Sequence, residues 1–393
     1  MTQETLDILA LTLIPGLGTA RIRRLIDLLG SPGEVLRATR SQLRALRVPR
    51  EARYYVSLGY ARRDAEQTVR RCAELGVRIL GWEEDDYPKL LREIFDPPLV
   101  VYCLGDVRVL SRHAVAVVGT RRCSSYGSEV AYTLGRELAE LGLVVVSGLA
   151  VGIDARAHLG SLAGGGPTVA VLGTGVDVPY PRSNRGLFKR ALENGCIVSE
   201  FPLGTPPTPQ NFPIRNRIIS GLCWGTVIPE AAEFSGSLIT ARLTLEQNRV
   251  LWAVPGNITS PGSFGPNYLI KQGARPLLST ADLLEDLPPH VLADLRADAF
   301  HPLEEAVLNE NEREIYRLLS VDNTRSFDFL LLKTGWTVPQ LSEALVSLEC
   351  KNLIRSYPGR RYGRRLRSLG GAGGSGGELR LHAGPPSEGG LER

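Results

Sequence analysis

The sequence AVAVVGTRRCSSYG, residues 114–127, decides the fold of this chain. Its apolar, β-rich run ends at Gly119, and a helical apolar pattern begins at Tyr126. A strand that ends in a glycine turn and opens a helix places backbone N–H groups at the C-terminal edge of a sheet. Open α/β sheets bind ligands at that edge, and helix N-termini favour anions. Because Arg121 and Arg122 add fixed positive charge there, the stretch predicts a phosphate-binding edge.

Strands and helices alternate on both sides of this stretch. The predicted strands are apolar runs at 77–80, 99–104, 115–118, 144–147, 168–172, 196–199, 226–229 and 250–254. Helical patterns occupy 126–141, 152–164, 183–194, 213–221 and 237–248. Nearly continuous apolar strands are typical of parallel sheets that are covered by helices on both faces. The chain therefore predicts an α/β fold, an extended Rossmann-like doubly wound parallel sheet with at least one additional strand before it.

Three further Gly/Ser-rich turns follow predicted strands and gather at the same edge as Gly119. One begins at Ser147 and Gly148 and leads to Gly152, a second is Gly-Thr-Gly at 173–175, and the third is Ser-Gly-Ser at 235–237. The Gly-Thr-Gly turn alone is a weak signal, because such turns are common without a cofactor. Together the turns supply backbone N–H groups and hydroxyls to one edge.

An aromatic residue and two arginines precede the strand at 226–229. Phe212 is followed closely by Arg215, Asn216 and Arg217. We expect Arg121, Arg215 and Arg217 to lie amid glycines and hydroxyls rather than carboxylates. Phe212 suits base stacking, which contributes about 1–3 kcal/mol per base. The set predicts a groove for a phosphodiester strand.

Several familiar site types are not supported by the motifs. No G-x-G-x-x-G follows the strand 115–118, and Ser147 stands where the ribose-binding acid of a dehydrogenase belongs. The chain also lacks G-x-x-x-x-G-K-[ST], which argues against a P-loop ATPase. No cofactor is predicted.

Three other side chains are candidates for catalysis. Asp154 and His158 are four residues apart on a predicted helix and face the same way. Without a nucleophile or third ligand at a recognisable spacing, we expect Asp154 to bond neighbouring turns with His158 as its buried partner. Glu230 could act in hydrolysis, but we expect it to pair with Arg215 or Arg217. The prediction is no catalytic residue and no metal site.

The composition indicates the cell compartment of the protein and bears on whether its partner is a nucleic acid. Of 46 basic residues 41 are arginine, but the net charge of +4 is too small to prove a nucleic-acid partner. The six cysteines form no C-x-x-C pair, which is typical of a reducing compartment. The N-terminus has no early positive charge, and no apolar run reaches the roughly 18–20 residues that span a bilayer. We predict a cytoplasmic protein without membrane contact.

Smaller domains are expected on both sides of the core, which we place at 73–285. Residues 1–72 look all-helical, and helix–Pro-Gly-Leu-Gly–helix is a helix-hairpin-helix signature, followed by Arg21, Arg23 and Arg24. The hairpin predicts either a weak, sequence-independent DNA contact or a bundle for partner and domain contacts.

The C-terminal part begins with an acidic linker, predicted at 286–305. Three helical patterns and a hairpin at 306–368 follow the order of a winged-helix domain. From Lys351 to Arg367 there are seven basic residues and no acidic one. Residues 369–393 contain nine glycines and are predicted to be disordered.

The core motifs resemble one family over about residues 82–285. They are VAVVGTR (115–121), VVSGLAVGIDARAH (145–158), TVAVLGTGVDVPYP (168–181), SEFP (199–202), FPIRNRIISGL (212–222), EAAEFSGSLITA (230–241), AVPGNI (253–258) and NYLIKQGA (267–274). In this order they resemble the DprA/Smf family of DNA-processing proteins. The N-terminal helices resemble the optional SAM-like or helix-hairpin-helix domain of that family, and the C-terminal part resembles its optional winged-helix domain.

The resemblance implies a binding protein rather than an enzyme. Such proteins coat incoming single-stranded DNA during natural transformation, protect it from nucleases, and help to load the RecA recombinase past single-strand-binding protein. The DNA pocket of the family carries over onto Arg121, Ser147, Gly148, Phe212, Arg215, Asn216, Arg217, Gly236 and Ser237, beside Gly119, Arg122 and Gly152 of the same turns. A lysine that some relatives have before the aromatic is absent from residues 208–210.

The family resemblance also implies a homodimer. The segment 267–287 has more apolar residues than one sheet edge needs, and we expect the interface at Leu269, Ile270, Leu277 and Leu278.

Two rival functions remain. Cytokinin-activating phosphoribohydrolases have a similar sheet, but this chain has PEAAEFSGSLITA where they carry P-G-G-x-G-T-x-x-E. A transcription regulator would rest on the winged helix alone.

Overall fold

The computed structural model describes residues 1–299, 308–319, 324–351, 353–357 and 359–364. Its centre is a sheet built from β1 (Val77–Gly81), β2 (Val100–Gly105), β3 (Ala114–Val117), β4 (Val144–Ser147), β5 (Thr168–Val171), β6 (Gly195–Ser199), β7 (Gly225–Ile228), β8 (Val250–Ala253) and β9 (Arg275–Pro276). The strand order is β1-β2-β6-β5-β4-β3-β7-β8-β9. The run from β6 to β9 is parallel, and β1 and β2 pair antiparallel at one edge. The predicted doubly wound sheet, with strands added before it, is confirmed.

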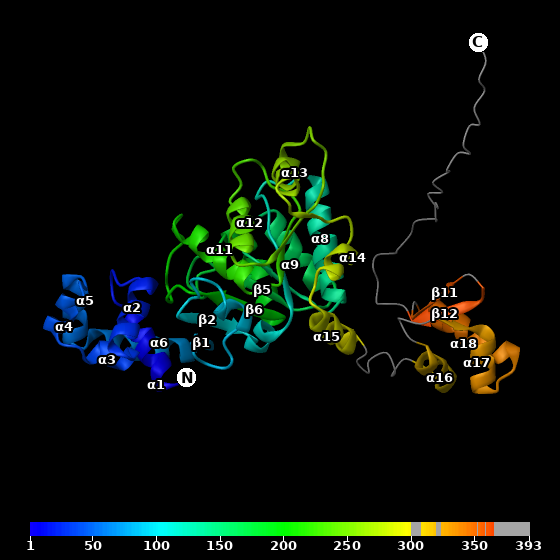
Figure 1. The fold of residues 1–393 in the computed structure, drawn as a ribbon, viewed down its shortest axis with the longest axis horizontal. Helices are drawn as coiled ribbons and strands as arrows, with labels where there is room; N and C mark the ends of the chain where they lie inside the picture. Colours follow the sequence, from blue (N-terminus) through cyan, green and yellow to red (C-terminus); the bar gives the residue numbers. More distant parts are fainter. Residues whose placement is uncertain (300–307, 320–323, 352, 358, 365–393) are drawn as a thin grey trace, which may run out of the picture.

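Helices cover both faces of the parallel strands (Figure 1). They are α7 (Lys89–Arg92), α8 (Ser125–Glu140), α9 (Ile153–Ala163), α10 (Arg185–Glu193), α11 (Asn211–Gly221), α12 (Ser237–Glu246), α13 (Phe264–Lys271), α14 (Thr280–Glu285) and α15 (Pro289–Ala299), with 3-10 turns at Val107–Ser111, Arg182–Asn184 and Pro261–Ser263. Side chains of a strand alternate between its faces. Val115 and Val117 of β3 accordingly join the apolar cluster under α8 and α9, whereas Ala114 and Ala116 join the cluster under α11 and α12.

The chain reverses direction across the sheet at β3. From β3 it proceeds through β4 and β5 to β6 on one side, and it then returns by α11 to β7 on the other side. The loops that leave β3 and β7 therefore diverge and open a crevice between neighbouring strands. In open α/β sheets such a switch point is where ligands bind.

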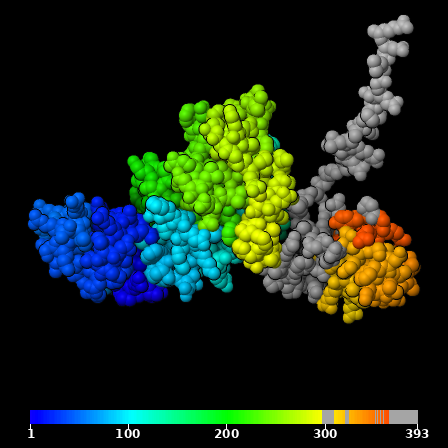
Figure 2. All heavy atoms as spheres, viewed as in Figure 1, coloured from blue at the N-terminus to red at the C-terminus, as the bar shows by residue number. Residues whose placement is uncertain are grey.

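The N-terminal helices are packed onto the antiparallel edge of the sheet (Figure 2). They are α1 (Gln3–Thr12), α2 (Thr19–Leu29), α3 (Pro32–Arg37), α4 (Arg40–Ala45), α5 (Arg50–Ser57) and α6 (Tyr60–Glu74). Ile8 and Leu11 of α1 share one apolar cluster with Val77 and Ile79 of β1. The predicted helical domain is confirmed, and its core is continuous with part of the sheet.

The segment predicted as a linker contains a helix. Val291 and Leu295 of α15 are buried in the cluster that lies under α8, although the segment is acidic and rich in proline. Asp294 lies on the exposed side of the same helix, and its Oδ2 is 2.9 Å from Nε2 of His113. The acidic composition therefore did not predict this helix within the expected linker 286–305. Acidic residues on an exposed helix face are compatible with an apolar inner face.

The C-terminal region has the predicted winged-helix order. It comprises α16 (Glu310–Leu318), β10 (Arg325–Ser326), α17 (Phe327–Thr334), α18 (Val338–Cys350), β11 (Ile354–Tyr357) and β12 (Arg361–Arg364). The three strands pair in the order β10-β12-β11. Its residues form an apolar cluster of their own around Ile315, Leu330 and Leu348. The predicted disordered tail, 369–393, lies outside the described residues.

Within the parts of the chain that the structure describes, no helix combines the length and the apolar character needed to cross a membrane.

Candidate nucleic-acid interface

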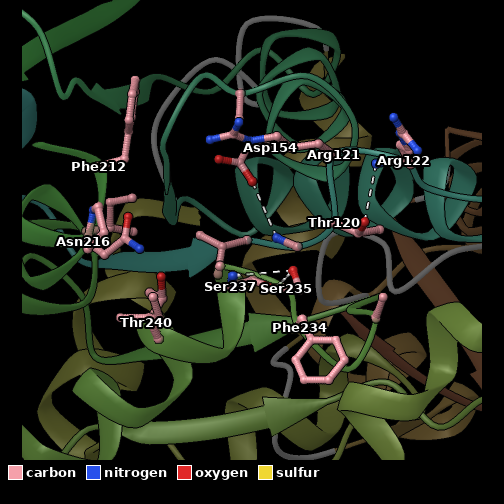
Figure 3. Close-up of a pocket in the computed structure, with 18 of the residues that line it drawn as sticks. Thr120, Arg121, Arg122, Asp154, Phe212, Asn216, Phe234, Ser235, Ser237 and Thr240 are labelled. Carbon is pink, nitrogen blue, oxygen red and sulfur yellow. Dashed lines mark hydrogen bonds between the residues drawn. The ribbon is translucent and has the colours of Figure 1, made fainter. Parts of the chain in front are cut away.

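A groove of about 990 Å³ lies at the switch point between β3 and β7. One side is formed by Thr120, Arg121 and Arg122 after β3, and the opposite side by residues 232–237 after β7. Phe212 and other residues from the first turns of α11 form a third wall (Figure 3). The structure thus brings the predicted turns and the predicted aromatic segment together.

The glycine that ends β3 permits a close approach of three segments. A Cβ on Gly119 would lie 2.6 Å from both the carbonyl oxygen of Glu230 and Cγ1 of Ile153. The Thr120 N–H donates to the same Glu230 carbonyl at 2.8 Å, and the Arg122 N–H donates to Thr120 Oγ1 at 3.2 Å. The loop is therefore held by the chain itself, and its two arginine side chains are exposed.

Asp154 ties two loops of the groove together. Its carboxylate accepts the Gly119 N–H at 3.3 Å and the Gly148 N–H at 3.1 Å, and the residue is 6% exposed. Burial raises the pKa of this carboxyl, while the Arg215 charge and the two N–H groups oppose the rise. Asp154 therefore bonds neighbouring turns, as expected, and these two N–H groups are already engaged.

His158 is buried but is not the partner of Asp154. Its Nδ1 lies 2.6 Å from Thr168 Oγ1, and that hydroxyl donates to the Val145 carbonyl at 2.7 Å. Since the hydroxyl proton is used, Nδ1–H of His158 donates to Thr168. Burial, with a smaller contribution from Arg215, lowers the pKa of His158 to about 3. The ring is neutral and structural, so the predicted Asp154–His158 pairing is wrong.

The N-terminus of α8 is occupied by Glu230. This buried carboxylate accepts the backbone N–H of Ser124 at 2.9 Å and also the Ser124 hydroxyl. A Cβ on Gly127 would collide with the carboxylate, so the first turn of α8 needs glycine. An internal anion thus satisfies the helix terminus that the sequence assigned to a phosphate. The predicted pairing of Glu230 with Arg215 or Arg217 is also wrong.

Arg215 lines the groove from below and is largely buried in its floor. Its guanidinium donates to the Gly148 carbonyl at 3.0 Å and to the Val171 carbonyl, and the residue is 5% exposed. Burial lowers its pKa to about 10, which still leaves the group charged at neutral pH. Its Nε donates to Asn216 Oδ1 at 3.3 Å, and Asn216 in turn lines the groove. Arg215 therefore contributes positive potential and holds the floor.

Arg217 was expected to lie away from carboxylates, but two carboxylates surround it. Its guanidinium donates to both carboxylate oxygens of Glu200, at 2.8 and 2.7 Å, and lies 3.5 Å from Asp96. Burial lowers the pKa of Arg217, but the two carboxylates outweigh burial and the net shift is upward. With its charge satisfied inside the protein, Arg217 holds α11 against the segment after β6.

Phe212 forms the aromatic wall. Its ring centroid is 5.5 Å from that of Tyr180, and the two rings are tilted by 39°. The guanidinium carbons of Arg121 and Arg215 lie 5.7 and 6.0 Å from the Phe212 centroid. These distances allow cation–π attraction. The exposed Arg121 side chain is thereby held beside the ring at the groove.

The wall after β7 supplies hydroxyls and a second aromatic. Ser235 and Ser237 are joined through their hydroxyls at 2.7 Å, and Gly236 is exposed between them. Phe234 is 93% exposed and lines the groove beside them. Phe234, Thr120 and Tyr180 also line the groove and were not predicted from the sequence. An aromatic inside a Gly/Ser turn was the available signal for Phe234, because turns seldom need an exposed ring.

The remaining predicted site residues have structural positions. Ser147 is fully buried and donates to the Val117 carbonyl at 2.7 Å. Gly148 faces the Arg215 guanidinium, where a Cβ would lie 2.6 Å from Nη2. Gly152 has a φ of +84° and lies so close to the Arg121 carbonyl that a Cβ would be 2.7 Å from it. These residues shape the floor and the β3 loop.

The four predicted interface residues differ in exposure. Leu269 and Ile270 are partly buried against the cluster under α11 and α12. Leu277 is only 3% exposed, so it is not available to a partner in this structure, whereas Leu278 is 80% exposed. On nearby α13, Phe264 and Tyr268 are half-exposed and stacked, with centroids 6.1 Å apart.

Fold and site together define an open α/β protein with a cationic, aromatic groove at the topological switch point. The family model for DNA recombination-mediator protein A matches residues 78–288, which is more than half of the chain. The model for the DprA winged-helix domain matches residues 301–360. The chain belongs to the DprA/Smf family of DNA-processing proteins, as the sequence motifs indicated.

Characterised relatives support this assignment. Protein Smf of Escherichia coli is 36% identical over 305 residues, which cover 77% of this chain and 81% of the relative. DNA processing protein DprA of Bacillus subtilis is 41% identical over 216 residues, covering 55% and 73%. The crystal structure of DprA from Streptococcus pneumoniae superposes with a TM-score of 0.62 at 32% identity, covering 73% of this chain and 99% of that one.

A second solved structure carries information about a ligand. DprA from Helicobacter pylori, described for its single-stranded DNA binding mode, has a TM-score of 0.50 and 32% identity. It covers 55% of this chain and 99% of its own.

Proposed function

We propose that this protein binds single-stranded DNA in the groove between β3 and β7. The observation that carries the proposal is the exposed Arg121 guanidinium held beside the Phe212 ring in a groove rimmed by hydroxyls. A guanidinium fork binds phosphate oxygens, and an aromatic face stacks on an unpaired base. The pairing of these two groups suits a single strand better than a free nucleotide or a duplex.

The relatives support the same ligand. The Helicobacter pylori structure is described for its single-stranded DNA binding, and the other relatives are described as DNA-processing proteins. The family match covers every segment that lines the groove. We infer that the bound strand is DNA that is being processed for recombination.

We infer that the protein acts by binding and not by catalysis. The two buried carboxylates at this edge of the sheet, Asp154 and Glu230, both accept backbone N–H groups, so neither is placed to activate water. Among the described residues, no group of three or more His, Cys, Asp or Glu side chains is positioned to hold a metal ion. This engagement of the carboxylates favours binding over the phosphoribohydrolase activity.

The wider role rests on the family resemblance. We propose that the protein protects incoming DNA during natural transformation and helps to load RecA, displacing single-strand-binding protein. We also propose a homodimer that uses the exposed surface around Leu278, Phe264 and Tyr268. A cytoplasmic location would fit this role.

Fluorescence anisotropy with labelled single-stranded and duplex DNA of equal length tests the groove. We expect Arg121→Ala to weaken single-strand binding by about 1–3 kcal/mol, the value of a charge-assisted contact. The slope of log affinity against log salt concentration should fall by about one unit, because one phosphate contact is lost. Phe212→Ala should reduce the preference for single strands more than the total affinity, because only an unpaired base can stack.

Phe95→Ala is a matched control, since Phe95 is fully exposed and is not among the residues that line the groove. If both folded groove variants bind both DNA forms as the unaltered protein does, the groove is not the site.

A further inference from the structure

The arginine-rich surface of the N-terminal domain lies on α4 and α5. Six arginines and a single acidic residue, Glu51, occur between residues 37 and 58. In Figure 1 α4 and α5 occupy the end of the helical domain that is farthest from the sheet. This surface is therefore separate from the groove between β3 and β7.

Three of these arginines surround one tyrosine. The guanidinium carbons of Arg40 and Arg50 lie 4.1 and 5.7 Å from the Tyr54 ring centroid. Arg50 also hydrogen-bonds the Tyr54 hydroxyl and, with Arg40 and Arg53, holds the pKa of this exposed tyrosine below its usual range. We call Arg40, Arg50, Arg53 and Tyr54 the arginine–tyrosine cluster.

The Arg40 guanidinium is fixed in place. Its Nε donates to Ser57 Oγ at 2.8 Å while its plane lies near the Tyr54 ring. Among the described residues, neither of its Nη groups has a hydrogen-bond acceptor. A guanidinium that is held at Nε presents its terminal N–H groups in a defined direction, which lowers the entropy lost when it binds an anion.

The charges of the cluster are not compensated inside the protein. No described carboxylate lies within ion-pair distance of Arg40, Arg50 or Arg53. Arginines elsewhere in the same domain are paired, such as Arg70 with Glu66 and Arg71 with Glu74. Three like charges that are gathered without a counter-charge repel one another, so the arrangement favours an external polyanion.

The predicted hairpin offers a weaker surface than this cluster. Arg23, one of the three arginines after the Pro-Gly-Leu-Gly turn, donates to the Pro97 carbonyl at 2.6 Å and lies 4.6 Å from the Trp82 ring centroid. Burial lowers its pKa. Arg23 therefore attaches the helical domain to the core and is not free to contact a phosphate.

We propose that the arginine–tyrosine cluster is a second phosphodiester-binding surface, which holds DNA that extends beyond the groove. The proposal rests on the proposed function, since the strand in the groove supplies the ligand. Guanidinium forks contact the backbone and carry no base information, so binding here is independent of sequence. It also does not require an unpaired base, and single-stranded and duplex extensions should both bind.

Anisotropy of the full chain with oligonucleotides of about 6 and about 40 nucleotides tests the cluster, because a site for a single strand spans about 4–16 nucleotides. The variant is Arg40→Gln/Arg50→Gln/Arg53→Gln. We expect unchanged binding of the short strand and at least about fivefold weaker binding of the long one at moderate salt. The slope of log affinity against log salt should fall by about two units for the long strand, or about 0.7 for each phosphate contact.

The matched control is Arg62→Gln/Arg70→Gln/Arg71→Gln, which removes the same charge from exposed positions of α6 in the same domain. Its slope should change by less than half as much as that of the cluster variant. Tyr54→Ala removes no charge but releases Arg40 from the ring, so it should weaken long-strand binding. Tyr54→Phe keeps the ring under Arg40, so it should bind the long strand more tightly than Tyr54→Ala does.

The two proposals fail in different ways. The short strand reports on the groove alone, so a folded Arg121→Ala variant that binds it normally contradicts the proposed function. An unchanged long-strand slope in the cluster variant, or an equal loss in the α6 control, overturns the cluster. Loss of binding to phosphatidylserine vesicles with DNA binding unchanged would instead assign the surface to membranes, and would also overturn it.

Discussion

Burial separates the three arginines that the sequence treated alike. Arg121 is exposed at the groove, Arg215 donates to backbone carbonyls beneath it, and Arg217 forms an ion pair with Glu200. A buried charge is tolerated only when the chain compensates it, so the two buried guanidinium groups are already occupied. We therefore expect direct phosphate contact from Arg121 and its exposed neighbour Arg122.

At the residue scale, His158 should make the stability of the core dependent on pH. The pKa of His158 is about 3 in the folded chain and about 6.5 in the unfolded chain. As the pH falls, the unfolded chain therefore binds the proton first. The stabilisation is complete above the unfolded pKa and is lost as pH falls toward the folded one. We expect a loss of about 2 kcal/mol between pH 7 and pH 5, measured by urea unfolding with core tryptophan fluorescence.

His158→Leu provides the comparison for this pH effect. The substitution costs stability at pH 7, since it disturbs a packed site, but it removes the titrating group. The difference in unfolding free energy between the two proteins should therefore shrink as the pH falls. If the unfolding free energies of the variant and the unaltered protein fall in parallel with pH, His158 is not the group responsible.

At the element scale, α8 depends on a cap from a distant segment. Glu230 follows β7 and accepts two hydrogen bonds from Ser124, the N-cap residue of α8. Glu230→Ala removes the acceptor of the Ser124 N–H and takes a buried negative charge away from the helix N-terminus. We expect it to destabilise the core by about 2–4 kcal/mol in urea unfolding, and Glu230→Gln to destabilise it less.

Glu233→Ala is the control for the cap, because Glu233 is exposed in the same loop. Its effect should stay within about 0.5 kcal/mol, as for most surface substitutions. Equal effects of the two alanine variants would mean that Glu230 does not cap α8.

The elements themselves were predictable from the sequence. Apolar runs in β3, β4 and β8 were placed within a residue or two, because buried parallel strands must be apolar throughout. The position of the groove followed from the same pattern, since the ends of parallel strands converge on one edge.

What the sequence could not supply was the partner of each polar group. The backbone N–H groups near Gly119 looked available for phosphate, yet Asp154 and Glu230, which follow other strands, accept several of them. Such pairings depend on loops that are distant in sequence and meet only in the fold. The helix α15 was missed for a related reason, since its apolar side is short and its exposed side is acidic.

At the scale of the whole molecule, exposed apolar residues near β9 predict a homodimer. Leu278 is 80% exposed after β9, and Phe264 and Tyr268, which stack on each other on α13, are 45% and 50% exposed. Large apolar side chains that stay exposed on one chain are candidates for an interface with a second copy. We expect dimers in sedimentation at micromolar concentration, and monomers for Leu278→Asp. Leu245→Asp, at an exposed position of α12, should remain dimeric. A monomer for the unaltered protein would contradict the prediction.

The winged-helix domain carries fewer free charges than its sequence suggested. Lys351 Nζ lies 2.7 Å from both carboxylate oxygens of buried Glu312, and Arg361 donates to Thr324. Along α18, where a recognition helix would face the major groove, Glu343 and Glu349 are exposed and no arginine occurs. These carboxylates would repel phosphates, so the domain is poorly suited to reading a duplex sequence.

Deleting residues 306–393 should therefore leave single-strand binding largely intact. The domain has its own apolar cluster, so its removal does not open the core that holds the groove. At low salt we expect an affinity close to that of the full chain in anisotropy measurements. As salt rises, a modest additional loss should appear if the hairpin around Arg360 contributes non-specific contacts. If the isolated domain instead prefers one duplex sequence by about a hundredfold over random DNA, or about 2.7 kcal/mol, it reads sequence and acts as a regulator.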